Sequence, residues 1–447
     1  MPEPQQPASY ESASDFAIKS VRLIKDGSEV NIAPLVGQLE IFENLQYPFL
    51  TGKLFFKDDA NIYETFSFNG TEICEITLTQ PSTSPIDIKK TFIIRSVLDT
   101  QKLNDMDEVI SLYLIEKISF DGSLQRFSKS YSGTPLEIIN KIAKEKLDII
   151  IDQPLVKPVQ KPMKVVIPGM TPLEAIAFIM ERMTTEDGLP YYFYSCLNED
   201  NLRITSLEEM LNEEAFNKDT PYRYSKAYAQ DETNNASNKN PFIVKTYSAG
   251  SGGSENTMGL QFGGAIAGSF SVTDLTTGRN EKSHFDIHNV FLRLMVKNVI
   301  PLGSIPNLDL KYDGKELQTF NSVQIHRAVA VNTYDNINNY YQEESLDQYQ
   351  LAMVRIAIQQ LFFKYFINLT VPGVPFLLGA HNSIGKQIEY LHLANDLEST
   401  EEKTASEDKM RDRKRSGNYM ISAAHHVFFD TKHTVEMSAV RLGMEQA

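Results

Sequence analysis

Histidine is the side chain best suited to hold a metal ion or move a proton near neutral pH, and this 447-residue sequence has eight. His284 and His288 have an i, i+4 spacing, but the glutamate of the H-E-x-x-H motif is missing and the segment favours β structure. His425, His426 and His433 fall on a predicted hairpin, where successive side chains point to opposite faces. We therefore expect core-edge or surface histidines and predict no metal site.

The other residues with chemical potential also lack a motif. Cys74 and Cys196 form no Cys-x-x-Cys pair, which predicts two free thiols in a reducing compartment. No G-x-S-x-G nucleophile motif occurs, and the glycine-rich stretch 250–268 contains neither phosphate-binding glycine motif. We expect that stretch to be a flexible loop or strand connection. The sequence thus predicts no catalytic, cofactor-binding or metal-binding residue, and a protein that is not an enzyme.

The charge balance is acidic, with 43 Lys and Arg against 58 Asp and Glu and a net charge of −15. Such a chain is not expected to wrap nucleic acid over its whole surface, because phosphate binding needs dense Lys and Arg. The only dense basic run, 411–415, is expected to pair with the acidic stretch 396–408. No apolar run reaches the roughly 20 residues that span a bilayer, so we predict no membrane insertion. Residues 1–14 are expected to be a disordered tail.

The elements expected to position these residues are mostly strands, as 20 Tyr and 25 Phe without Trp suggest. Block 15–128 alternates apolar and polar residues in six or seven short runs, with Asp26-Gly27 as a hairpin signal. Its last hairpin is expected over 92–118. The block predicts a small antiparallel barrel or sandwich.

A helical period follows in block 129–228. The tetrapeptide Thr-Pro-Leu-Glu occurs at Thr134 and again at Thr171, and each predicts a helix start with threonine as the N-cap. The Pro-rich stretch 154–168 separates the two helices, and Tyr191–Tyr194 begins a predicted strand pair. This block is expected to be a small α/β unit.

The remaining chain returns to a β pattern. Region 229–342 is expected to be a β-rich connection containing the glycine-rich loop and a hairpin at Asp313-Gly314. A long helix is expected over 343–366. The strands expected after it are 368–379, 384–393 and a terminal hairpin over 419–442, with a charged, exposed loop at 395–417, where 13 of 23 residues are charged.

This order of elements resembles the baseplate hub protein of T-even-like contractile-tail bacteriophages, which is related to type VI secretion spike hub proteins. The resemblance covers about residues 15–447, and the insertion 395–417 and the glycine-rich loop depart from it. It rests on three places: Gly169–Ile176 leading to Leu189–Tyr194, Glu343–Ile367 leading into Leu369–Gly373, and the terminal pair Tyr419–His426 and His433–Met437.

The resemblance implies an α+β, mainly β fold with two tail-tube-like antiparallel β-barrels separated by a small α/β region. The domains expected are a tail at 1–14, barrel 1 at 15–128, a helix-helix-strand domain at 129–228, a connecting region at 229–342, and a helix with barrel 2 at 343–447.

The resemblance also implies a structural role without cofactors. Three copies would form a pseudo-hexameric ring that adapts the hexameric tail tube to the trimeric central spike and gives DNA a channel for ejection. The implied partners are a second and third copy of the chain, the spike, the tube or tube-initiator protein and the baseplate wedge, with genomic DNA only in transit. The implied location is the virion tail baseplate, after synthesis in the bacterial cytoplasm. An acidic chain suits a DNA conduit, because like charges keep the duplex from adhering.

Two other functions remain open at this point. The chain could be a hub or spike component of a type VI secretion system or phage-tail-like particle, which would share the fold and deliver proteins. It could also be a cell-wall-binding or lytic tail protein, although no placed Glu or Cys/His pair indicates a lytic site.

Overall fold

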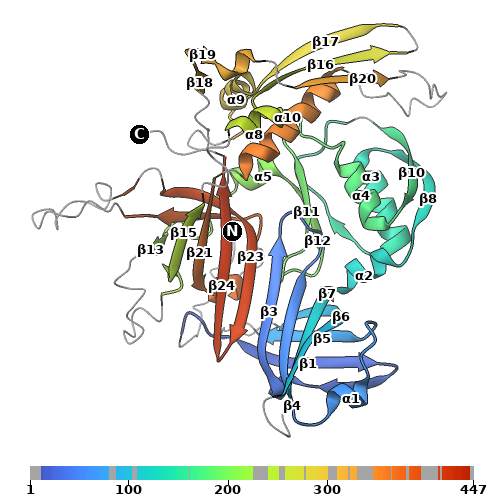
Figure 1. Ribbon diagram of the computed structural model, residues 1–447, viewed down its shortest axis with the longest axis vertical. Coiled ribbons are helices and arrows are strands. Elements are labelled where there is room, and N and C mark those ends of the chain that lie inside the picture. Colours follow the sequence, from blue (N-terminus) through green and yellow to red (C-terminus); the bar gives the residue numbers. More distant parts are fainter. Residues whose placement is uncertain are drawn as a thin grey trace, which may run out of the picture.

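The computed structural model describes residues 12–79, 87–102, 108–160, 162–224, 240–250, 257–275, 278–300, 310–320, 323–329, 346–363, 365–378, 382–393, 411–412 and 415–442. Two β units, an α/β unit and a peripheral unit of helices and strands make up this part of the chain (Figure 1). The fold is α+β and mainly β, as predicted.

The first β unit is a curled antiparallel sheet with strand order β2-β1-β5-β6-β7-β4-β3. Alternate side chains of each strand point inward and share one apolar core. Asp26 and Gly27 both have positive φ, as the two-residue hairpin turn between β1 and β2 requires. The elements are β1 (Ala17–Lys25), β2 (Ser28–Asn31), η1 (Ala33–Leu35), β3 (Val36–Asn44), β4 (Thr51–Asp58), α1 (Ile62–Phe66), β5 (Ile73–Thr79), β6 (Asp87–Lys102) and β7 (Glu108–Glu116).

The α/β unit begins its two main helices where the repeated tetrapeptide predicts. Thr134 and Thr171 each cap a helix, and the glutamate three residues later completes a capping box worth about 1 kcal/mol. The Pro-rich stretch also holds a strand, β10, that the sequence did not indicate. The elements are α2 (Lys117–Ser123), β8 (Phe127–Gly133), α3 (Pro135–Ile142), the π-helix η2 (Ala143–Leu147), β9 (Ile151–Asp152), β10 (Met163–Met170), α4 (Pro172–Met180), β11 (Tyr191–Tyr194), β12 (Leu202–Ser206) and α5 (Leu207–Asn212).

The second β unit is a closed barrel. Strand β14 pairs with β13, and β15, which follows β14 directly in the chain, pairs with β21. The ring then runs through β24, β23 and β22 back to β13. The elements are β13 (Tyr222–Tyr224), β14 (Ile243–Val244), β15 (Thr246–Gly250), β21 (Tyr365–Pro372), α11 (Val374–Leu378), β22 (Gln387–Leu391), β23 (Gly417–Phe429) and β24 (Lys432–Arg441).

The strand expected over 368–379 is wrong in its second half. Strand β21 ends at Pro372, and the short helix α11 follows at Val374–Leu378. Pro372 is the last residue of β21 to pair with β24, and Pro375 lies in the first turn of the helix, where a missing N–H costs nothing. The terminal hairpin is confirmed by β23 and β24.

The peripheral unit lies between β15 and β21 in the chain. It has a three-stranded sheet of order β17-β16-β20, flanked by helices (Figure 1). The hairpin predicted at Asp313-Gly314 is present. The elements are α8 (Thr257–Phe262), β16 (Ala267–Asp274), β17 (Asn280–Asp286), α9 (Ile287–Val296), β18 (Lys311–Tyr312), β19 (Lys315–Glu316), η4 (Leu317–Thr319), β20 (Gln324–Val329) and α10 (Leu346–Phe362).

Three expectations for this unit need correction. The region predicted to be β-rich contains helix α9, which Asp286 caps and which buries Val290, Phe291 and Leu294 at helical spacing. The stretch 250–268 is not one loop, because its described part holds α8 and the start of β16. The long helix α10 ends at Phe362, four residues before the predicted end, and residues 343–345 lie outside the described residues.

Both segments expected to be unstructured have ends that pack on the second barrel. Ala13 and Ser14, assigned to a disordered tail, are buried and accept backbone hydrogen bonds from Val374 and His433. Most of 395–417 lies outside the described residues. Its end is packed, since Asp412 donates its N–H to the carbonyl of His392.

The two β units repeat one arrangement of elements. In chain order, β3, β4, α1, β5, β6 and β7 match β15, β21, α11, β22, β23 and β24. The pairs β3–β4, β4–β7, β6–β7 and β5–β6 match β15–β21, β21–β24, β23–β24 and β22–β23, and all are antiparallel. The chain therefore contains the same barrel-like unit twice.

The two units are joined edge to edge. Strand β23 of the second unit pairs with β3 of the first over Ala423–Phe429 and Gln38–Asn44. Eight antiparallel strands thus form one surface across both units, in the order β15-β21-β24-β23-β3-β4-β7-β6. We call this surface the shared sheet.

Candidate assembly surface

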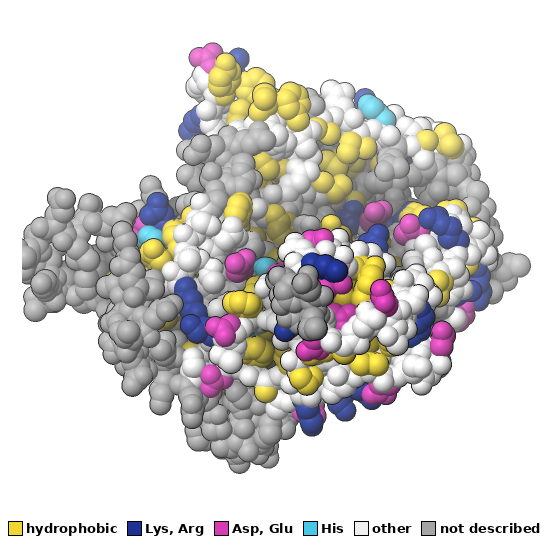
Figure 2. Space-filling model, turned by 60° about the horizontal axis from the view of Figure 1, so that its bottom comes forward, with side chains coloured by type: hydrophobic (Ala, Val, Ile, Leu, Met, Phe, Trp, Pro, Cys, Tyr) yellow, Lys and Arg dark blue, Asp and Glu magenta, His cyan; other side chains and the backbone are white. Residues whose placement is uncertain are grey.

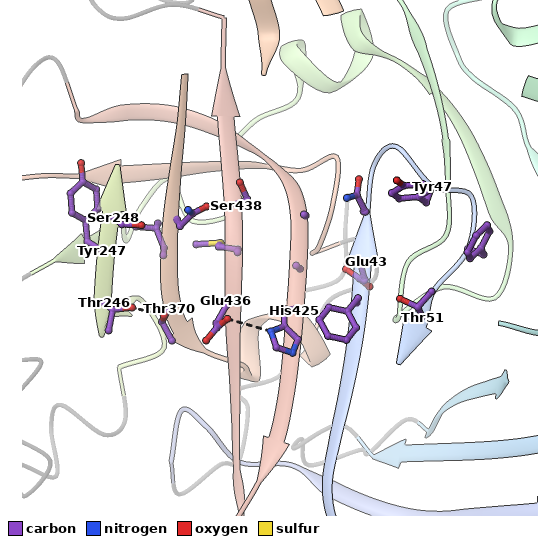
Figure 3. Close-up of a pocket in the computed structure, with 18 of the residues that line it drawn as sticks. Glu43, Tyr47, Thr51, Thr246, Tyr247, Ser248, Thr370, His425, Glu436 and Ser438 are labelled. Atoms are coloured by element: carbon purple, nitrogen blue, oxygen red, sulfur yellow. Dashed lines mark hydrogen bonds and ion pairs between the residues drawn. The ribbon is translucent and has the colours of Figure 1, made fainter. Parts of the chain in front are cut away.

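One face of the shared sheet packs on the cores of the two units, and the other face lines an open groove (Figure 3). The groove has a volume of about 830 Å³ and receives side chains from both units. Its residues include Phe42, Tyr47, Thr51, Arg95, Tyr113, Thr246, Ser248, Asn368, Thr370, His425, Glu436 and Ser438.

His425 lies at the joint between the two units. Its Nδ1 is 3.3 Å from a carboxylate oxygen of Glu436 on β24 (Figure 3). Its Nε2 is 3.4 Å from a carboxylate oxygen of Glu40 on β3. The imidazole also stacks on Phe42 of β3, with ring centroids 4.2 Å apart. One side chain therefore makes contacts on both sides of the joint.

Short uncharged polar side chains follow the groove across β15, β21 and β24. Thr246 and Thr370 are register partners and share a hydroxyl–hydroxyl hydrogen bond. Ser248, Asn368 and Ser438 form the next row across the same three strands. Hydroxyls and amides on a solvated sheet face give a wettable surface without net charge.

Charged groups of both signs lie on this face. Lys53 lies 3.9 Å from Glu40, and the Arg95 guanidinium lies 5.8 Å from the ring centre of Tyr113. The same face also carries Glu436, Asp99, Lys57 and Lys432, so both signs of charge occur on it. Acidic and basic side chains are also interspersed over the molecular face drawn in Figure 2. The face has no strong field of one sign.

A buried polar cluster lies beneath the joint. Glu43 of β3 is fully buried and accepts hydrogen bonds from the Ser383 hydroxyl and the Leu197 N–H. His426 Nε2 is 3.5 Å from the same carboxylate, and His426 Nδ1 is 3.1 Å from Nε2 of His433. The cluster ties the first β unit to the second and to the α/β unit.

The cluster shifts the proton affinities of its members. Burial acts to raise the pKa of Glu43, but the hydrogen bond and charge interaction with His426 and the hydrogen bonds from Ser383 and Leu197 outweigh it and leave that pKa lowered. Burial, with the neighbouring His426, holds the pKa of His433 well below 6.5. We infer an ionised Glu43 beside a neutral His433.

The histidines singled out from the sequence were expected at the core edge or the surface, but His426 and His433 are fully buried. His284 lies in β17 and His288 in the first turn of α9, so they do not form a pair on one helix. His425 and His426 face opposite sides of β23, while His433 joins His426 across the hairpin. Among the described residues, no three metal-ligating side chains come together.

The remaining candidates stay apart. Cys74 is in the first core and Cys196 in a core of the second unit; burial raises the pKa of the Cys74 thiol to about 12 and that of Cys196 well above its usual value. In the basic run, Arg415 pairs with Asp412 inside the run, at 3.5 Å, while residues 413–414 and the acidic stretch 396–408 lie outside the described residues.

Sequence reasoning missed Glu43 and the edge-to-edge joint. Glu43 occupies the inward position of an alternating strand, where an apolar residue is the rule, and this break in the pattern was the available signal. In the part of the chain that the structure describes, no helix is both long and apolar enough to cross a membrane.

Comparison with known proteins gives a likeness of fold. No family model and no curated protein matches the sequence. Among solved structures, the prophage MuSo2 43 kDa tail protein from Shewanella oneidensis aligns over 95% of this chain and 98% of its own, with 12% identity and a TM-score of 0.52. The tail protein from Neisseria meningitidis MC58 aligns over 96% and 98%, with 13% identity and a TM-score of 0.50. The chain therefore has the fold of these phage-type tail proteins along nearly its whole length.

Proposed function

We propose that this chain is a structural subunit of a phage-type tail baseplate, without enzymatic activity. Three copies form a ring of six barrel-like units that joins a hexameric tail tube to a trimeric spike. The shared sheets line the ring and leave a channel for DNA ejection. Its partners are its own copies, the spike, the tube or tube initiator, and the wedge of the baseplate in the virion.

The observation that carries this proposal is the duplicated unit. Each unit contributes four strands to one antiparallel sheet, and the joint β23–β3 shows how one unit follows the next. A head-to-tail joint of this kind forms a ring when the rotation from one unit to the next closes. Three copies of the eight-stranded sheet would give about 24 strands, above the 16–18 at which barrels already enclose a water-filled channel.

The lining of the groove supports passage rather than binding. Its hydroxyl and amide rows offer no dense Lys and Arg, and the sheet around it carries both signs of charge, as at Lys53 and Glu40. Duplex DNA adheres where cations replace its counterions, so a balanced surface holds it weakly. The net charge of −15 also repels DNA, and this repulsion acts at longer range than contacts within the groove.

The experiment is a mass measurement of the full chain by light scattering, alone and with the spike protein. A trimer in either sample is expected. A stable dimer with the spike, or a monomer that never binds it, would overturn the proposal.

The alternative functions have separate readouts. A hub of a type VI secretion system or phage-tail-like particle would form the same ring, and a particle that transports protein in place of DNA would identify it. A lytic tail protein would clear peptidoglycan in a zymogram, which we do not expect.

A further inference from the structure

The shared sheet has two ends at which one strand edge has no partner among the described residues. At one end, β15 pairs only with β21. At the other end, β6 pairs with β5 as far as Ile93, and its continuation, Arg95–Lys102, pairs only with β7. Unpaired strand edges are templates for pairing with another chain.

The repeat of the two units shows which joint these edges can make. In the matched order of elements, β6 corresponds to β23, and β15 corresponds to β3. Strands β23 and β3 are the two that pair at the joint within the chain. The free edges of β6 and β15 are therefore the two halves of a second joint of the same kind.

The register of that joint follows from β-bulges. Strand β23 has a bulge between Ile421 and Ala423, and β6 has one between Ile94 and Ser96. Superposing these bulges makes Ala423 the counterpart of Ser96. Their register partners, Ser438 on β24 and Tyr113 on β7, are then counterparts of each other.

Counting from these partners fixes one residue on each free edge. Two residues before Tyr113 is Ser111, opposite Asp99, and two before that is Val109, opposite Gln101. The same steps from Ser438 lead to Thr434, opposite Val427. Gln101 of β6 is thus the counterpart of Val427 of β23.

On the other side of the sheet, Tyr113 is opposite Lys53, and Lys53 is opposite Glu40. Ser438 is opposite Asn368, which is opposite Ser248. Ser248 of β15 is thus the counterpart of Glu40 of β3.

We propose that β6 of one copy pairs antiparallel with β15 of the next copy, with Gln101 opposite Ser248, because their counterparts Val427 and Glu40 are opposite each other within the chain. The same register places Asp99 opposite Gly250. The proposal rests on the proposed ring, and it adds the edges and the register that close it.

The chemistry of the two edges fits a second copy of this chain. Thr246 and Ser248 on β15, and Asp99, Thr100 and Gln101 on β6, are polar and exposed. Each edge therefore stays soluble in the single chain, and pairing satisfies backbone N–H and C=O groups without burying an unpaired charge.

The test is a cross-link between copies in the full chain. In the double variant Gln101→Cys/Ser248→Cys, mild oxidation followed by alkylation is expected to give a covalent trimer on a non-reducing gel, which a reductant returns to monomer. Facing positions of paired strands have Cβ atoms about 4.5–5.5 Å apart, and a small movement brings them to the roughly 3.5–4.5 Å of a disulfide. The native Cys74 and Cys196 are buried and should stay reduced.

A matched control moves one cysteine by two residues on the same face. Gln101→Cys/Thr246→Cys is expected to cross-link at least tenfold more slowly, because the step moves the second cysteine about 6–7 Å along β15 and away from the facing position. Equal rates for the two double variants would overturn the register.

A second measurement needs no substitution. Amide hydrogen exchange at 99–101 and 248–250 is expected to slow at least tenfold when wild-type chains assemble with the spike. A trimer that shows neither this protection nor the cross-link would overturn the proposed edges and leave the ring intact. A chain that never forms a trimer would overturn both.

Discussion

The backbone N–H of Leu197 donates a hydrogen bond to the buried carboxylate of Glu43, across 154 positions of the chain. The Leu197 side chain is buried in the core of the first β unit, although Leu197 belongs to the α/β unit. Nearby, Ser195 donates its hydroxyl to Glu116, and Lys90 donates to the carbonyl of Glu199. The loop 195–199 therefore fastens the α/β unit onto the first β unit.

Removing the Leu197 side chain should loosen this attachment. We expect Leu197→Ala to lower the free energy of unfolding by about 2–4 kcal/mol, because it leaves a cavity in a closed core. Chemical denaturation measures it. Leu155→Ala is the control, since Leu155 is 88% exposed and its loss should cost under about 0.5 kcal/mol. Equal effects of the two variants would show that Leu197 does not fasten the units.

Acid should destabilise the fold from near neutral pH downward. The pKa of His433 in the folded chain lies well below 6.5. Below pH 6.5 the unfolded chain therefore binds a proton at His433 more readily than the folded chain does. The stability linked to His433 is thus complete above pH 6.5 and is lost below it, at up to about 1.4 kcal/mol per pH unit. The lowered pKa of Glu43 adds a further loss below about pH 4.5.

Urea unfolding at pH 7.5, 6.0 and 5.0 measures this slope. His433→Asn removes the titrating group, so its stability should depend less on pH between 7.5 and 5.0. An unchanged slope in that variant would assign the acid sensitivity to other groups.

Gly373 should not tolerate a side chain. A Cβ there would collide with the imidazole of buried His433, so we expect Gly373→Ala to cost about 2 kcal/mol or more in thermal or urea unfolding. Gly37→Ala is the matched control, because Gly37 is in a strand, has no positive φ and leaves room for a Cβ. A Gly373 variant as stable as the control would show that the hairpin readily moves away.

Reversing a charge on the groove face should create DNA binding. Under the proposed function, Glu436→Lys places three lysines around the channel, and we expect tighter duplex binding whose affinity falls with salt. Fluorescence anisotropy at 50 mM and 200 mM salt measures it.

Glu29→Lys changes the net charge equally on β2, outside the shared sheet, and should leave DNA binding near the wild-type level. Tight binding by the wild-type trimer would contradict a conduit lined by this face.

The charged segment should divide into a dispensable part and a structural end. Replacing 395–408 by a short Gly/Ser linker should leave the melting temperature within a few degrees, because so polar a stretch is costly to bury. Ser416→Ala should cost about 1–3 kcal/mol, since the buried Ser416 hydroxyl bonds both the N–H and the carbonyl of His392. A large loss with the linker would mean that 395–408 is packed or docked.

The sequence by itself determined the local elements. The Thr-Pro-Leu-Glu starts at Thr134 and Thr171 became capped helices, and the Asp-Gly pair at Asp26 became a hairpin turn. These features depend on hydrogen bonds and φ preferences within a few residues, which a local pattern records. The same locality explains why the mainly β fold class was predictable.

Predictions from local patterns failed where residues distant in sequence determine the conformation of a segment. Helix α9 was expected to be β, because its Val290 and Phe291 suit a strand as well as a buried helix face. The strand predicted past Pro372 gives way to helix α11, whose Phe376 and Leu377 are buried in the two cores. In both places the packing partner selects the conformation.

Only the tertiary structure decided the joint and its polar cluster. Strands β3 and β23 pair although some 380 residues separate Phe42 from His425. The alternating pattern of either strand does not predict which strand it pairs with. The same pairing encloses Glu43 with His426 and Ser383 in a buried site. An alternating strand specifies which face is apolar, whereas the neighbour at each edge follows from how the whole chain closes.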